Sequence, residues 1–202
     1  MPRPGYVLFS VNRSCVSDFQ GYLVITDPQG RVRWYYGPPG VVSSEASDIE
    51  FLQVDAERLL FGGGEDPNAR PQLLDLDGRV LYGSDYAGAE DDVYHHDVEW
   101  TADGHIIGIV NSTLTFDGES KKGFNLVEQD PDKHAVTWRF DVQSAVDAGA
   151  LVPSLVSDAF HPNALAATED ADGPAYYVNL SNVQKIARVD RTTLDGGLTR
   201  IE

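Results

Sequence analysis

Short runs in which apolar and polar positions alternate make up most of the chain, and turn residues separate the runs. Four segments each contain an apolar run, an Asp-rich turn and a second apolar run: 23–36 (LVITDPQGRVRWYY), 72–83, 125–141 and 186–202. Alternation with a period of two predicts half-buried β-strands, and Asp and Gly at the corner are typical of a hairpin. The sequence therefore predicts four β-hairpins.

A second pair of strand patterns precedes three of these hairpins, and half of such a pair precedes the first. These segments are 48–64, 96–111, 162–180 and, as the half unit, 5–12. A four-strand unit that recurs every ~50 to 65 residues is typical of β-propeller blades and not of a β-sandwich. We predict an all-β fold, a β-propeller of four-stranded antiparallel blades with about four blades present, forming a single domain over residues 1–202. The segment 142–158 is the one helical candidate.

Two of the five histidines are adjacent, in the stretch YHHDVEW, and a third lies in FHPNAL. When the repeats are aligned on Asp48, Asp97 and Asn163, both His95 and His161 lie two residues before the aligned position. Equivalent positions of successive blades line one ring of a propeller channel, so we expect His95 or His96 to lie near His161. Imidazole groups titrate near neutral pH and serve as acid, base or nucleophile.

Two other interpretations of these histidines stay open. Each histidine beside a strand start is also compatible with a hydrogen-bonded turn. A metal site made of His95, His96 and Asp97 is the other alternative, although no further ligand follows at short or helical spacing. Cys15 is the only cysteine, so an intrachain disulfide and a cysteine zinc site are both excluded. We expect no metal and no cofactor, and we interpret His105 and His134, which lie in hairpin turns, as structural.

The composition is strongly acidic, with a formal net charge of −17 and a pI near 4.4. Such a charge repels phosphates and argues against a nucleic-acid partner. The chain has 22 Asp and 10 Glu but only 4 Lys beside 11 Arg. This composition suits high salt, so a halophilic origin and an ordinary acidic secreted protein are both open. No apolar run approaches ~18 residues, and the N-terminal residues lack the pattern of a signal peptide, so no membrane span is expected.

Four stretches together resemble the arylsulfotransferase family, the PAPS-independent aryl-sulfate sulfotransferases of bacterial and archaeal envelopes. They are GYLVITDPQGRVRWYY, YHHDVEWTADGHIIGIVN, FHPNAL and YYVNLSNVQKIARVDRTT. The resemblance covers nearly the whole chain. It implies a six-bladed propeller with a histidine-lined channel, of which this chain would hold the first four blades, an N-terminal portion of a longer propeller.

The resemblance also implies an activity, the transfer of sulfate from a phenolic sulfate ester to a phenol through a sulfated histidine. Carried over by motif, His95, His96 and His161 would be catalytic, and Asn163 and Asp97 would bind substrate. The partners would be small phenolic sulfates and phenols. The location would be periplasmic or extracellular, although a chain without a signal peptide leaves the cytoplasm open. The sequence does not indicate the oligomeric state.

Two departures from the family pattern support a second hypothesis. The family's presumed nucleophile is a later histidine in a blade that would follow Glu202, and Ser181 stands where the family usually carries an arginine. A serine hydroxyl does not replace the charge that an arginine offers to a sulfate. The alternative function is therefore a non-catalytic propeller that binds an anion or a protein partner.

Overall fold

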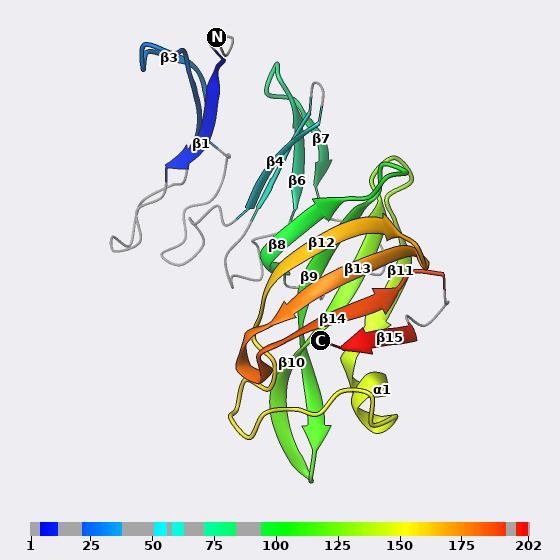
Figure 1. Cartoon of the computed structure of the whole chain (residues 1–202). Coiled ribbons are helices and arrows are strands. Elements are labelled where there is room, and N and C mark those ends of the chain that lie inside the picture. The colour runs from blue at the N-terminus through cyan, green and yellow to red at the C-terminus, as the bar shows by residue number, and fades with distance from the viewer. Residues whose placement is uncertain are drawn as a thin grey trace. The chain divides into compact units, whose positions relative to one another are not determined.

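The computed structural model describes residues 5–11, 22–37, 51–55, 58–62, 71–83, 94–192 and 197–201, and these residues are all-β apart from one short α-helix and a 3-10 turn. Asp48 and Cys15 lie outside the described residues. The strands form four antiparallel sheets, in which each strand pairs with its neighbour in the chain (Figure 1). None of these sheets closes on itself. The chain divides into two compact units, residues 1–83 and 84–202.

The first unit contains a three-stranded and a four-stranded sheet. The first sheet has β1 (Val7–Val11), β2 (Tyr22–Thr26) and β3 (Val32–Tyr36), and the second has β4 (Phe51–Asp55), β5 (Arg58–Gly62), β6 (Gln72–Asp75) and β7 (Val80–Gly83). The buried side chains of Leu23, Leu59 and Leu74 form the core of this unit, and Trp34 and Tyr36 pack against it. These strands occupy the predicted segments 5–12, 23–36, 48–64 and 72–83, so the predicted hairpins are confirmed here.

The second unit contains two four-stranded sheets joined by α1. Its elements are β8 (Tyr94–Trp100), β9 (Ile106–Phe116), β10 (Glu119–Asp130), β11 (Ala135–Asp141), α1 (Val142–Asp147), β12 (Pro162–Asp170), β13 (Gly173–Leu180), the 3-10 turn η1 (Ser181–Val183), β14 (Lys185–Asp190) and β15 (Gly197–Ile201). One continuous core of buried residues joins both sheets and α1. The predicted hairpins at 96–111, 125–141, 162–180 and 186–202 are confirmed.

The same turn closes several of these hairpins, and it explains the recurring Asp-x-x-Gly pattern. At Asp27 the backbone N–H donates to Arg31 O at 3.0 Å, and the side-chain Oδ1 accepts from Arg31 N at 3.0 Å. Gly30 occupies the left-handed position with φ 77°, which favours glycine because a Cβ is disfavoured there. Asp75 and Gly78 repeat this hydrogen bonding, so the repeat is encoded locally at each corner.

The segment predicted as a helix over 142–158 is helical only at Val142–Asp147. Asp141 caps its start, because its side chain accepts hydrogen bonds from Gln143 N and Ser144 N. The helix ends at Asp147 with Ala148 as its C-cap, and Gly149 follows with φ 69°. Beyond the helix, Leu151 is buried in the core, but Val152, Leu155 and Val156 are exposed, so the apolar positions that suggested a longer helix do not form one buried face. Within the described residues, no helix has the length and apolar character needed to cross a membrane.

Candidate functional site

The first strands of the two sheets in the second unit, β8 and β12, lie side by side (Figure 1), and the ladder of each is irregular next to a histidine. In β8, Tyr94 pairs with Val110, but the next paired residue is Val98, so residues 95–97 bulge out of the ladder. In β12 the register shifts between Pro162 and Ala164. Such bulges change the direction of side chains and are frequent beside active sites.

His96 and His161 share an unusual backbone conformation. Their φ angles are 61° and 47°, in the left-handed region that few residues other than glycine adopt. Backbone strain of this kind is common at functional sites. The sequence alignment paired His95 with His161, whereas the backbone pairs His96 with His161. Both strands are irregular near these residues, so counting back from Asp97 and Asn163 does not give the pairing that the backbone angles and the ring contact show.

The rings of His95, His96 and His161, here called the histidine cluster, lie together. The ring centroids of His95 and His96 are 4.9 Å apart, and those of His96 and His161 are 5.6 Å apart. Both pairs meet edge to face, at 77° and 66°. The tertiary structure therefore brings together histidines from two different sheets.

His95 is the most buried member of the histidine cluster, with 5% of its surface exposed. Burial, and then the neighbouring His96, lower the pKa of His95 to about 4. The ring is therefore neutral at pH 7. Its Nε2 atom is buried and has no hydrogen-bond partner among the described residues. Buried polar atoms are usually paired, so this nitrogen is an unusual feature of the cluster.

His161 is held by Asp158, which the sequence analysis did not identify. Asp158 Oδ2 lies 2.6 Å from His161 Nδ1, and Asp158 Oδ1 accepts from the backbone N–H of His161 at 3.0 Å. The exposed Lys122 pairs with Asp158 through an isolated backbone bridge, and its positive charge contributes to the lowered pKa of His95. Asp158 lies only three residues before His161, but it fell at the end of the segment predicted as helix and was not recognised as a partner.

Asp97 and Asn163 also lie beside the cluster, and their side chains are already engaged. Asp97 Oδ1 accepts from Val98 N at 3.0 Å, and Oδ2 accepts from Leu165 N at 2.8 Å, which ties β8 to β12. Burial raises the pKa of Asp97. Asn163 Nδ2 donates to Ser181 Oγ at 2.9 Å, and Asn163 is exposed. Asp97 thus ties β8, which carries His95 and His96, to β12, which follows His161.

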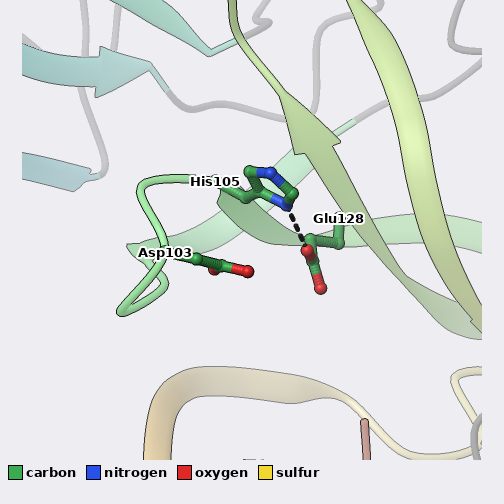
Figure 2. Close-up of side chains that lie close together, drawn as sticks. All are labelled: Asp103, His105 and Glu128. Atoms are coloured by element: carbon green, nitrogen blue, oxygen red, sulfur yellow. Dashed lines mark hydrogen bonds and ion pairs between the residues drawn. The ribbon is translucent and has the colours of Figure 1, made fainter. Parts of the chain in front are cut away.

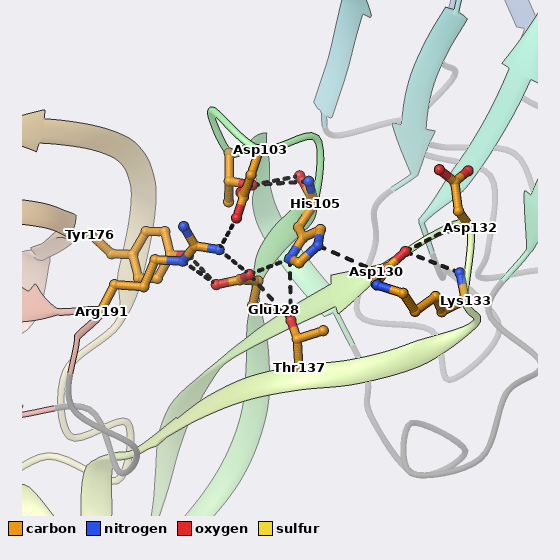
Figure 3. Close-up of polar contacts among 10 residues, drawn as sticks. Asp103, His105, Glu128, Asp130, Asp132, Lys133, Thr137, Tyr176 and Arg191 are labelled. Atoms are coloured by element: carbon orange, nitrogen blue, oxygen red, sulfur yellow. Dashed lines mark hydrogen bonds and ion pairs between the residues drawn. The ribbon is translucent and has the colours of Figure 1, made fainter.

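A second polar cluster lies beyond the C-terminal end of β8, the end away from His95 and His96, and joins the two sheets of the second unit (Figure 3). Glu128 on β10 is 1% exposed and accepts from Arg191 Nε at 2.7 Å and Arg191 Nη2 at 2.5 Å. Tyr176 Oη and His105 Nδ1 also contact this carboxylate, and Arg191 bonds Asp103 at 2.7 Å. We call these five residues the Glu128 cluster. Burial acts to raise the pKa of Glu128, but hydrogen bonds from Arg191, Tyr176 and His105 keep it below its usual value.

Three members of the Glu128 cluster have the residue types of a metal site (Figure 2). One ligand atom from each of Asp103, His105 and Glu128 lies within 4.8 Å of the others. The guanidinium of Arg191 already occupies the position beside both carboxylates, and it supplies the positive charge that a metal would bring. The arrangement therefore fits a structural ion-pair network. His105 was interpreted as a turn residue from the sequence; the contacts with Glu128 and Arg191 were not foreseen.

The fold and the histidine cluster together define an all-β protein of repeated antiparallel sheets with converging imidazoles where two sheets meet. Residues 5–172 match the family model described as Arylsulfotransferase (ASST), and the chain belongs to this family. The resemblance seen in the sequence is confirmed.

A more distant likeness is to the crystal structure of a protein from Bacteroides fragilis NCTC 9343, provisionally described as a 6-phosphogluconolactonase. The identity is 12% and the TM-score 0.48, and the match covers 96% of this chain and 55% of that one. A likeness this distant supports no functional conclusion. This chain spans little more than half the length of that protein. No curated protein matches the chain.

Proposed function

We propose that this chain acts on aryl sulfates, and that the histidine cluster transfers a sulfate group from a phenolic sulfate ester to a phenol. The observation that carries the proposal is the meeting of His96 and His161, both with left-handed backbone, in a chain of the arylsulfotransferase family. Protonated imidazoles donate charge-assisted hydrogen bonds to sulfate oxygens, and they protonate a departing phenolate.

The residues of the histidine cluster have different proposed roles. His95 stays neutral because its pKa is about 4, and its buried ring packs edge to face against His96. His96 and His161 exchange protons with the phenolic oxygens. Asn163 orients the sulfate beside His161, and Asp97 holds the two strands together.

The proposal includes an architecture. The four sheets are successive blades of one β-propeller over residues 1–202, and β8 and β12 are the strands nearest its channel. The periplasm or the extracellular space is the proposed location, in keeping with envelope enzymes of this family. A crystal structure in which the four sheets share no common axis would overturn the propeller, and cell fractionation tests the location.

The test is an assay with p-nitrophenyl sulfate as donor and a phenol as acceptor, run over a series of KCl concentrations. His96, His161 and the turn residue His134 all have positive φ, at 61°, 47° and 52°. Asparagine tolerates this conformation, so His96→Asn and His161→Asn test the imidazoles without new strain, and His134→Asn is the matched control. We expect a loss of roughly 100-fold or more in kcat/KM for the first two variants and none for the control.

A second candidate function is anion binding without turnover. The Oγ of Ser181 accepts from Asn163 and donates to Asn179, so this position, usually an arginine in the family, carries no positive charge. Titration with sulfate by calorimetry separates the two candidates. Sulfate binding that His161→Asn abolishes, in a chain that releases no nitrophenol at any salt concentration, would favour the non-catalytic function.

A further inference from the structure

Asp158 contacts His161 in a way that determines which ring nitrogen carries hydrogen. Oδ2 of Asp158 lies 2.6 Å from Nδ1 of His161. An ionised carboxylate only accepts hydrogen bonds, so Nδ1 carries the hydrogen in this contact. In the neutral ring the lone pair is then on Nε2.

The segment that carries Asp158 is fastened at several points, so its carboxylate has a defined position. Lys122 N donates to Ser157 O at 2.8 Å, and Ala159 N donates to Lys122 O at 3.0 Å, on either side of Asp158. Asn182 Nδ2 donates to the carbonyl of Asp158 at 2.7 Å. These contacts come from β10 and η1, so both sheets of the second unit hold the aspartate in place.

The same segment is tied to β10 by a buried cation. Lys121 is 6% exposed, and its Nζ donates to the carbonyl oxygens of Leu155 and Val156 at 3.0 and 3.2 Å. A buried ammonium group needs such acceptors, because its desolvation would otherwise be costly. The loop between α1 and β12 is therefore a fixed support for the histidine cluster.

We propose that Asp158 is the positioning residue of the site: it holds His161 as the Nδ1–H tautomer, so that Nε2 accepts the proton of the acceptor phenol. This role in turnover rests on the proposed function. As the phenol reacts, its hydroxyl proton moves to Nε2 of His161 and its oxygen forms the new bond to sulfur. The bond between sulfur and the phenolic oxygen of the donor ester breaks, and its electron pair leaves on the donor phenolate. The imidazolium keeps its Nδ1–H on the Asp158 carboxylate.

Asp158→Asn is the discriminating variant. The asparagine carbonyl still accepts from the backbone N–H of His161, which preserves the loop, whereas its NH₂ group donates to Nδ1. The neutral ring then carries hydrogen on Nε2 and can no longer accept a proton there. Asp147→Asn is the matched control, because Asp147 is exposed on α1 and bonds Gln143 instead of a histidine.

Two measurements separate the failure of this inference from failure of the proposed function. Nitrogen-15 NMR of labelled histidine should show Nδ1–H for His161 in the wild-type chain and in Asp147→Asn, and Nε2–H in Asp158→Asn, at unchanged melting temperature. In the assay, kcat should fall by roughly 10²- to 10⁴-fold in Asp158→Asn, with little change in KM.

The inference is overturned, whatever the activity, if His161 carries Nε2–H in the wild-type chain or if its tautomer is unchanged in Asp158→Asn. The wild-type spectrum alone decides the tautomer if the variant does not fold. A changed tautomer with undiminished turnover shows that the aspartate has no part in the reaction. A changed tautomer in a chain whose wild type transfers no sulfate upholds the tautomer assignment and overturns the proposed function. A large rise in KM alone would indicate a purely structural role.

Discussion

Replacing Arg191 by methionine should destabilise the second unit far more than an ordinary ion pair would. Glu128 is 1% exposed, and Arg191 donates two hydrogen bonds to it. Removing one partner of a buried pair typically costs about 3–5 kcal/mol, because an uncompensated charge is left behind. We expect about 3 kcal/mol, the lower end of that range, because Tyr176 and His105 still contact the carboxylate.

Urea denaturation at pH 7 measures this loss of stability. Two further variants test whether the loss comes from the buried charge of Glu128. Lys133 Nζ also lies 2.5 Å from a carboxylate, that of Asp130, but its side chain is 77% exposed. Lys133→Met should therefore leave the free energy of unfolding unchanged, since solvent screens that pair and Asp130 keeps two backbone donors. The double variant Arg191→Met/Glu128→Gln should be more stable than Arg191→Met by about 1 kcal/mol or more, because it removes the buried charge.

The pH dependence of Arg191→Met follows from the same contacts. In the wild type the pKa of Glu128 lies below 4.5, so its contribution to stability is present above that pH and is lost as pH falls through the folded pKa. Without Arg191, burial dominates and raises the pKa of Glu128. Protonation of Glu128 then removes the buried, unpaired charge that destabilises the variant. The difference in stability between wild type and variant should shrink as pH falls from 7 towards 4. A cost below about 1 kcal/mol at pH 7, or a double variant no more stable than the single one, would refute the reasoning.

Three other predictions concern His95, Gly108 and the acidic surface. The pKa of His95 in the folded chain is lowered from 6.5 to about 4, so the free energy of unfolding should fall by about 3 kcal/mol as pH drops through that interval. His95→Phe should remove this loss of stability. Acid titration followed by circular dichroism measures it. Gly108→Ala should cost about 1–3 kcal/mol in urea denaturation, because a Cβ would lie 2.6 Å from the ring of Tyr94; no loss would mean that the ring moves freely. If the chain is halophilic, its melting temperature should rise steadily as KCl increases from about 0.1 to 2 M, whereas a flat curve would argue for an ordinary acidic protein.

The strands were predictable because their signals are local. Alternating apolar positions define each hairpin, and the Asp27–Gly30 corner carries its own hydrogen bonds within five residues. The helix over 142–158 was wrong in its length for a related reason. Leu151 reaches the common core from a loop, whereas Val152, Leu155 and Val156 are exposed, and the apolar pattern alone does not distinguish such a loop from a buried helix.

The candidate site could be predicted only in part. The repeat and the family motifs pointed to His95, His96 and His161, since these residues lie in recognisable stretches. The sequence alignment nevertheless matched His95 to His161, because a bulge changes the register without leaving any signal in the alternation of residues. The left-handed backbone of His96 and His161 was likewise not visible in the sequence.

The sequence by itself determined the all-β class, the hairpins and their corners, and membership of the arylsulfotransferase family, because each depends on neighbouring residues or on motif order. Only the tertiary structure decided which charged groups meet. Asp158 reaches His161 from the loop before β12, and Arg191 reaches Glu128 from the adjacent sheet. Asp158 is only three residues from His161, but contacts from β10 and η1 fix the loop that directs its carboxylate. Arg191 and Glu128 are 63 residues apart, so only the packing of the two sheets brings them together. Neither contact follows from the alternation of apolar and polar residues.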